Sequence, residues 1–115
     1  MRYMLLIYSG DKAAPPPSRA EMEAMMQGHG RFAGDLEAAG KMVHGERLRP
    51  DSEASRVRLK AGHRQVMDGP FAETKEVLGG FYLIECETKD EAVEWSKKIP
   101  LREGGFVDVV PVWPM

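Results

Sequence analysis

Residues 68–76 read DGPFAETKE, and the chain continues almost at once as LGGFY at residues 78–82. The first three residues of this run form a turn signal between two apolar segments, because glycine frees the backbone whereas proline restricts it. Three charged residues follow within the same run: Glu73, Lys75 and Glu76. We expect the bend to direct Asp68 and this charged cluster toward one region of the protein.

Toward the N-terminus of this turn, the pattern predicts a strand and a long helix. Residues 3–8, YMLLIY, are short, apolar and rich in strand-forming types. Ser18 with Glu21 is a capping-box pattern that opens a helix, and Gly40 closes that helix. Apolar residues recur along it at alternating spacings of three and four, which predicts one buried stripe. The stripe consists of Met22, Met25, His29, Phe32, Leu36 and Ala39.

The rest of the chain predicts five more strands and a second helix. The strands are expected at residues 42–48, 57–60, 65–67, 80–87 and 106–113. The second and third of these form a hairpin that turns at Ala61-Gly62. Thr88 with Glu91 is a second capping box, and Pro100 stops the helix that it opens. This order predicts an α+β fold: a ferredoxin-like split β-α-β antiparallel sheet with two helices on one face and a β-hairpin insertion, in a single domain over residues 1–115.

Three of the predicted strands are apolar on both faces, whereas an antiparallel sheet with one wet face should alternate apolar and polar residues. Neighbours that point to opposite faces are both apolar, as at Leu5 with Leu6 and at Val109 with Val110. Two short helices cannot cover both faces, so the second face needs another partner. The simplest partner is the same sheet of a second copy, and we therefore expect a homodimer with its sheets face to face.

The composition excludes several classes of function. The 115 residues are 43% hydrophobic and 30% charged, which is ordinary for a soluble globular domain. A net charge of -2 provides no broad attraction to nucleic acid or to an anionic membrane. The single cysteine, Cys86, excludes an internal disulfide and a cysteine-based zinc site. No phosphate-binding loop, dinucleotide fingerprint or signal-peptide pattern is present, so we expect no cofactor and a cytoplasmic location.

Short motifs spread over nearly the whole chain match one protein family in the expected order. They lie at residues 3–8, 45–50, 68–76, 78–82, 92–95, 99–100 and 111–113. Through them the chain resembles the YCII-related family, and closely its DGPF-domain branch. The resemblance implies a dimeric α+β barrel and a cytoplasmic bacterial protein. Because genes of this branch often lie beside those of extracytoplasmic-function sigma factors, it also implies a regulatory connection.

His29 is the strongest single candidate for a catalytic residue. The related YCII branch is associated with acid-base chemistry by a histidine on the first helix, eleven residues before the glycine that ends this helix. In this chain His29 stands eleven residues before Gly40, so the resemblance implies the same role for His29. A partly buried imidazole beside a carboxylate can have its pKa tuned for proton transfer near neutrality. The alternative is a core histidine bonded to a backbone carbonyl.

Asp68 is the candidate acidic partner of His29, so the two residues form the predicted catalytic pair. The alternative is structural, because an aspartate before Gly-Pro commonly accepts hydrogen bonds from nearby backbone N–H groups and so caps the turn.

Four further residues are candidates for ligand binding: Glu46, Glu73, Lys75 and Glu76. Lys75 could anchor an anion, or the cluster could be a solvated loop held by its own ion pairs, although exposed pairs contribute only roughly 0–1 kcal/mol. Glu46 shares one strand face with His44, but no third ligand stands at a useful spacing, so no metal site is expected.

These candidates support three hypotheses. The first is a small cofactor-free enzyme in which His29 and Asp68 move a proton on a small organic, or anionic, substrate. The second is a non-catalytic ligand-binding or regulatory protein that senses a small molecule or contacts a sigma factor. The third is a stable dimer in which residues 68–76 only organise a loop and the subunit interface.

Overall fold

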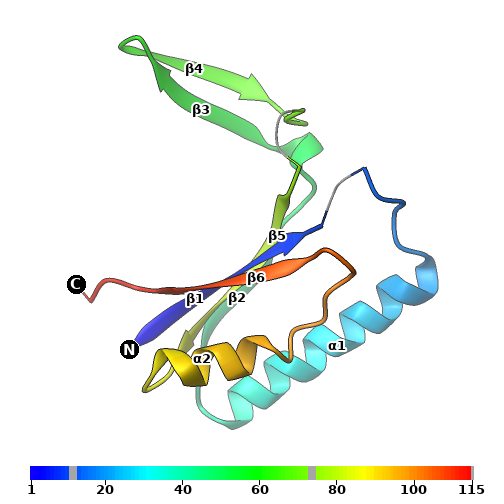
Figure 1. The fold of residues 1–115 in the computed structure, drawn as a ribbon, viewed down its shortest axis with the longest axis vertical. Coiled ribbons are helices and arrows are strands. Elements are labelled where there is room, and N and C mark those ends of the chain that lie inside the picture. The colour runs from blue at the N-terminus through cyan, green and yellow to red at the C-terminus, as the bar shows by residue number, and fades with distance from the viewer. Residues whose placement is uncertain (11–12, 73–74, 115) are drawn as a thin grey trace.

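The computed structural model describes residues 1–10, 13–72 and 75–114. Its elements follow one another along the chain as Figure 1 shows. They are β1 (Arg2–Ser9), α1 (Arg19–Ala38), β2 (Met42–Arg47), the short 3-10 turn η1 (Asp51–Glu53), β3 (Ser55–Lys60), β4 (His63–Asp68), β5 (Val77–Glu85), α2 (Lys89–Ser96) and β6 (Phe106–Pro111). Every expected element is present. The strand expected at residues 80–87 begins three residues earlier and ends two residues earlier than predicted.

Four strands form the main sheet in the order β2-β5-β1-β6, and all neighbouring pairs run antiparallel. Helices α1 and α2 lie on the same side of this sheet (Figure 1). The remaining strands, β3 and β4, pair only with each other. The α+β, ferredoxin-like arrangement with a hairpin insertion is therefore confirmed.

Helix α1 has the predicted ends. The Ser18 hydroxyl accepts a hydrogen bond from the Glu21 N–H at 3.1 Å, and the Glu21 carboxylate accepts one from the Ser18 N–H at 3.4 Å. This reciprocal pair satisfies backbone donors that the first turn of a helix leaves free. Gly40 follows the helix with a φ of +71°, a left-handed conformation that glycine adopts without strain. The helix spans 20 residues, and His29 lies at its middle.

The core lies between the helices and the sheet, and it contains Tyr3, Leu5, Phe32, Leu36, Ile84, Cys86, Ala92 and Ile99. The apolar stripe of α1 enters this core only in part. Phe32 and Leu36 are buried, but Met22 is 38% exposed and the C-cap Ala39 is exposed. The expectation of one continuous buried stripe is therefore wrong, because the N-terminal half of α1 faces a cavity and not packed side chains.

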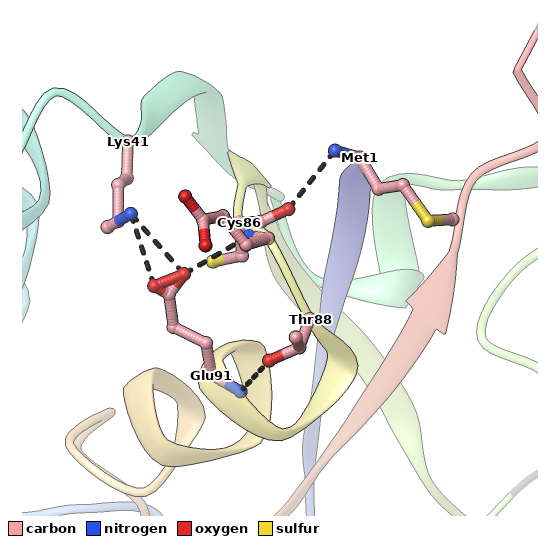
Figure 2. A network of polar contacts seen from close by, with 6 residues as sticks. Met1, Lys41, Cys86, Thr88 and Glu91 are labelled. Carbon is pink, nitrogen blue, oxygen red and sulfur yellow. Dashed lines mark hydrogen bonds and ion pairs between the residues drawn. The ribbon is translucent and has the colours of Figure 1, made fainter.

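Helix α2 begins at Thr88, whose hydroxyl accepts a hydrogen bond from the Glu91 N–H at 3.2 Å. The expected second capping box forms only in part, because the Glu91 carboxylate accepts a hydrogen bond from the Glu87 N–H at 3.2 Å and not from the Thr88 N–H. The same carboxylate pairs with the Lys41 ammonium at 3.1 Å, a contact that Figure 2 draws. Beside this pair, the N-terminal ammonium of Met1 donates to the Cys86 carbonyl at 3.1 Å. These contacts hold α2, the segment before β2 and the start of β1 together at one end of the sheet.

The turn at residues 68–71 closes the base of the β3–β4 hairpin. The Gly69 N–H donates to the Ala54 carbonyl at 2.8 Å, and a Cβ atom at this position would collide with the backbone carbonyl of Asp51. Only glycine therefore allows the two segments to approach so closely. The Asp68 carboxylate accepts a hydrogen bond from the Ser55 hydroxyl at 2.8 Å, directly across the hairpin.

Phe71 completes this base. Its side chain is buried, and the Arg56 guanidinium lies over its ring at 3.9 Å from the centroid, a favourable cation–π contact. Lys75 and Glu76 are exposed after it, whereas Glu73 lies outside the described residues. The turn motif therefore has a clear architectural role, because it attaches the hairpin to the rest of the domain.

The β3–β4 hairpin, residues 55–68, extends away from the main sheet as an arm (Figure 1). The radius of gyration is 15.9 Å, above the value of about 13 Å expected for a compact domain of this length, because the arm adds to the extent of the molecule. Val57, Leu59 and Val66 on the arm are each at least 60% exposed. A two-stranded hairpin is only marginally stable alone in water. The exposed apolar side chains of this arm therefore indicate a surface that packs against another element.

The face of the main sheet opposite the helices is also apolar. The register pairs Leu6 with Phe81 and Met4 with Leu83, and these residues alternate with the core residues of the same strands. Helices α1 and α2 both lie on the other side, so neither of them covers this open face. Among the described residues, no helix is long and apolar enough to cross a lipid bilayer.

Two glycines of α1 predict opposite effects of the same substitution. A Cβ atom at Gly28 would lie 2.6 Å from the Pro100 ring, whereas a Cβ atom at Gly34 would meet no atom within 4 Å. Gly34→Ala should raise the free energy of unfolding by about 0.5–1 kcal/mol, the cost of glycine in a helix interior. Gly28→Ala should lower it, because overpacking costs about 1–3 kcal/mol. Urea denaturation of both variants tests this packing, and equal stabilisation by the two substitutions would contradict it.

Candidate functional site

A cavity of about 1190 Å³ lies between the N-terminal half of α1 and the sheet. Its walls come from α1, from β2 and β5, and from the loops that precede α1 and β6. Sites for small molecules and cofactors typically measure about 300–1000 Å³, so this space is large enough for a small organic ligand.

The cavity exists because the sheet presents glycines beneath this half of α1. Gly79 and Gly80 of β5 and Gly45 of β2 all line it. A Cβ atom at Gly80 would lie 2.9 Å from a backbone carbonyl, and one at Gly45 would lie 2.7 Å from the Tyr82 ring. Glycine inside a strand often marks a place where a ligand or another group approaches the backbone closely. Here it leaves space for the Tyr82 ring to lie flat over β2.

His29 and Tyr82 meet in this cavity. The Nδ1 atom of His29 and the Tyr82 hydroxyl share a hydrogen bond of 2.9 Å, and the two rings are nearly parallel with an interplanar angle of 22°. The Phe32 ring contacts Tyr82 edge-on at a centroid distance of 5.0 Å. This packing fixes the tyrosine ring, and the hydrogen bond in turn fixes the orientation of the imidazole.

Both members of this pair favour their neutral forms. Partial burial lowers the pKa of His29 below its ordinary value of 6.5, and the positive charge of Arg47 lowers that pKa further. Burial also raises the pKa of Tyr82. Near neutral pH the imidazole can therefore accept a proton, while the phenol keeps the hydrogen that it can donate.

Within one chain, the structure gives His29 a different partner from the one that the sequence predicts. Asp68 is exposed at the base of the arm, where its carboxylate bonds to Ser55. The imidazole is hydrogen-bonded instead to the Tyr82 hydroxyl. A single chain therefore does not bring Asp68 to His29.

The predicted ligand-binding residues are spread over the molecule. Glu46 contributes to the wall of the main cavity, and its carboxylate lies 3.8 Å from His44. Glu76 lines a smaller cavity of about 590 Å³ at the base of the arm, and Lys75 is exposed. Glu73 is outside the described residues. Among the described residues, no three His, Cys, Asp or Glu side chains are placed to hold a metal ion together.

Sequence reasoning missed two residues of this site. The sequence predicts Tyr82 and Arg47 only as parts of strands. Neither has a local sequence signal, because antiparallel pairing brings Arg47 opposite Gly80 and packing brings Tyr82 to a helix 53 residues away. The pair Gly79-Gly80 inside an apolar strand is the signal that could have indicated the cavity.

The fold and the site together define a small ferredoxin-like α+β protein with an apolar cavity between its first helix and its sheet. The YCII-related domain matches residues 1–115, and the chain belongs to this family. An uncharacterized protein from Rhizobium meliloti (strain 1021) is 39% identical over 99 residues, which cover 86% of this chain and 80% of that protein. The recognition of the family from its scattered motifs is thus confirmed.

The electrostatics of the cavity predict how His29 titrates. Its pKa should lie below 6.5, and Arg47→Gln should raise it, because the substitution removes a positive charge that disfavours protonation. Arg49→Gln is the matched control: Arg49 is paired with Glu53 and should leave the pKa of His29 unchanged. NMR titration of the imidazole measures these values. A pKa at or above 6.5 in the wild-type protein would contradict the description.

The same shift has a consequence for stability. Because the pKa of His29 is lower in the folded state, the unfolded chain binds the proton more readily as the pH falls below 6.5. The contribution of His29 to stability is therefore lost as the pH falls through the folded-state pKa. His29→Asn should remove this part of the acid destabilisation.

Proposed function

We propose that this cavity binds a small organic molecule and that His29 exchanges a proton with it, without a cofactor. The observation that supports the proposal most strongly is the 2.9 Å bond between His29 and Tyr82 inside a cavity lined by glycines and methionines. A titratable group of lowered pKa in a large apolar cavity has the features of a functional site. Packing alone is a poor explanation, since the side chains of this region leave the space open.

The proposed chemistry uses the two neutral groups in different roles. In the proposed tautomer the Nδ1–H of His29 donates to the Tyr82 oxygen, which leaves the Nε2 lone pair for a substrate, because none of the described residues bonds to it. A C–H bond next to a carbonyl breaks, its proton passes to Nε2, and its electron pair moves onto the carbonyl oxygen to form an enolate. The Tyr82 hydroxyl can donate a hydrogen bond to that oxygen. Return of the proton to the same or another carbon completes an isomerisation without net oxidation or reduction.

In this proposal Asp68 holds the base of the arm and does not carry the proton. The His29–Asp68 pair and the link to an extracytoplasmic-function sigma factor remain predictions from the sequence and the family resemblance.

A non-catalytic ligand-binding protein is the second candidate. The methionines of α1 favour it, because methionine side chains adapt to ligands of different shape.

The molecule is further proposed to act as a homodimer, with the open faces of two sheets packed together. The apolar pairs Leu6–Phe81 and Met4–Leu83 on that face support this arrangement. The arm supports it as well: it carries four basic residues against one acidic residue, while the whole chain has a net charge of -2. The arm of one copy is thus complementary in charge to the acidic remainder of another.

Deuterium exchange tests proton transfer without knowledge of the natural substrate. Phenylpyruvate and the neutral ketone phenylacetone serve as probes, because each joins an aromatic ring to C–H groups beside a carbonyl. In D₂O, the wild-type protein should accelerate exchange of these hydrogens above the buffer rate. His29→Asn should abolish the acceleration, a loss on the order of 10²–10⁴-fold, and Tyr82→Phe should reduce it. Exchange is followed by proton NMR.

The matched control is His63→Asn, since His63 lies on the exposed arm. Acceleration that survives in His29→Asn would reject the proposed role of His29. Binding of the probes without any accelerated exchange would favour the ligand-binding function.

Light scattering tests the dimer. The wild-type chain should have twice the monomer mass at micromolar concentration, and Leu6→Glu should yield a folded monomer, because it places a charge on the open face. Ala20→Glu, on the exposed side of α1, is the control and should stay dimeric. A wild-type protein that is strictly monomeric would contradict the proposed homodimer.

A further inference from the structure

Arg47 is a cation whose surroundings differ from those of its neighbours. It lies at the end of β2, opposite Gly80, and lines the main cavity. Its guanidinium contacts the Met26 sulfur at 3.4 Å, and it forms no ion pair with any carboxylate in the described part of the chain. By contrast, Arg49 pairs with Glu53 at 2.9 Å and Arg102 with Glu21 at 3.5 Å. A thioether is a weak acceptor and Arg47 is exposed, so its guanidinium donors are available to a ligand in the cavity.

The charge of Arg47 also reaches His29. It is one of the two causes that lower the pKa of this histidine, so the guanidinium and the imidazole belong to the same electrostatic environment. Met26, which contacts Arg47, stands three residues before His29 on α1, and residues at that spacing are neighbours on a helix surface. The cation from β2 and the proton-transfer group from α1 therefore both lie beside Met26 at the cavity.

Part of the wall beside them is apolar. Met22, Met25 and Met26 project from the N-terminal half of α1, and Leu101 approaches from the loop before β6. This arrangement of a cation without an ion-pair partner, a titratable pair and an adaptable apolar wall matches one chemical class of ligand.

We propose that Arg47 anchors the acidic group of an organic anion whose apolar body lies against the three methionines of α1, which places its reactive carbon near His29. This inference rests on the proposed function and specifies its substrate class. Arginine suits this role because its planar guanidinium can bind both oxygens of a carboxylate or sulfonate.

Acidic residues also line the cavity, but they stand apart from this anchor. Glu37 lies eight residues beyond His29, about 12 Å along the helix axis. Glu46 neighbours Arg47 on β2, where successive side chains point to opposite faces, and its carboxylate lies beside His44. Glu103 belongs to the loop before β6. The proposed anion site is therefore centred on Arg47.

Binding of an anion at Arg47 has a consequence for the proton transfer. The groups that face His29 are Arg47 from β2 and the neutral phenol of Tyr82 from β5, with the apolar Pro100 against the preceding turn of α1. An anion beside Arg47 offsets its field and raises the pKa of His29, so the substrate itself makes the imidazole a stronger base. By linkage, the anion binds more tightly when His29 is protonated.

Two fluorescent probes with the same aromatic body separate the anchor from the cavity. The probes are 8-anilinonaphthalene-1-sulfonate, an anion, and N-phenyl-1-naphthylamine, its neutral counterpart. The folded wild-type protein should bind the anion more tightly, with an affinity that falls as salt is added. Arg47→Gln should weaken binding of the anion about tenfold and leave the neutral probe unchanged. Arg47→Lys should recover part of the loss.

Arg49→Gln is the matched control, because it removes an equal charge two residues away from a side chain that is already paired. Circular dichroism confirms that each variant is folded, since these dyes also bind partly folded chains. If the neutral probe binds and Arg47→Gln does not weaken binding of the anionic probe, the proposed role of Arg47 is rejected, while the cavity remains a binding site. If neither probe binds, the proposed ligand-binding cavity itself is rejected.

Discussion

The absence of side chains on the sheet beneath the first half of α1 is the constraint on which the site depends. Gly45, Gly79 and Gly80 line the space, and larger residues at Gly45 or Gly80 would meet the Tyr82 ring or a backbone carbonyl. Because Gly45 has no side chain, Tyr82 can lie over β2 and reach His29. The same cavity prevents the apolar stripe of α1 from packing into the core along its whole length.

The molecule therefore divides into a packed end and an open end. At the packed end, Phe32 and Leu36 of α1 meet Ile84 and Ala92 in the core, and the Lys41–Glu91 pair fixes α2 close by. At the open end, α1 continues over the cavity and presents His29 and the methionines to it. The packed end provides the stability that lets the open end keep a large apolar space, which a small domain seldom retains without a function.

The architecture was largely predictable because its signals are local. The Ser18–Glu21 capping box, the turn at Ala61-Gly62 and the short apolar runs of the main-sheet strands depend on neighbouring residues, and all three are present. The second capping box forms only in part, because the Glu91 carboxylate bonds to the Glu87 N–H and to the distant Lys41, and not to the Thr88 N–H. Competition of this kind cannot be seen from spacing alone.

The site was predictable only in part. His29 could be selected because its helix position and the family resemblance agree, but its partner could not. Tyr82 and Arg47 reach it through strand register and helix packing, which the sequence does not specify. The catalytic role of Asp68 stays a prediction, and Gly69 and Phe71 give the turn around it a structural role at the base of the arm.

A crystal structure of the protein with 8-anilinonaphthalene-1-sulfonate bound tests the central claim most directly. The account predicts the sulfonate within hydrogen-bond distance of the Arg47 guanidinium, the naphthalene ring against the methionines of α1, and the His29–Tyr82 bond intact. Density for the probe only on the open face of the sheet or on the arm, with the cavity beneath α1 filled by protein side chains, would contradict it.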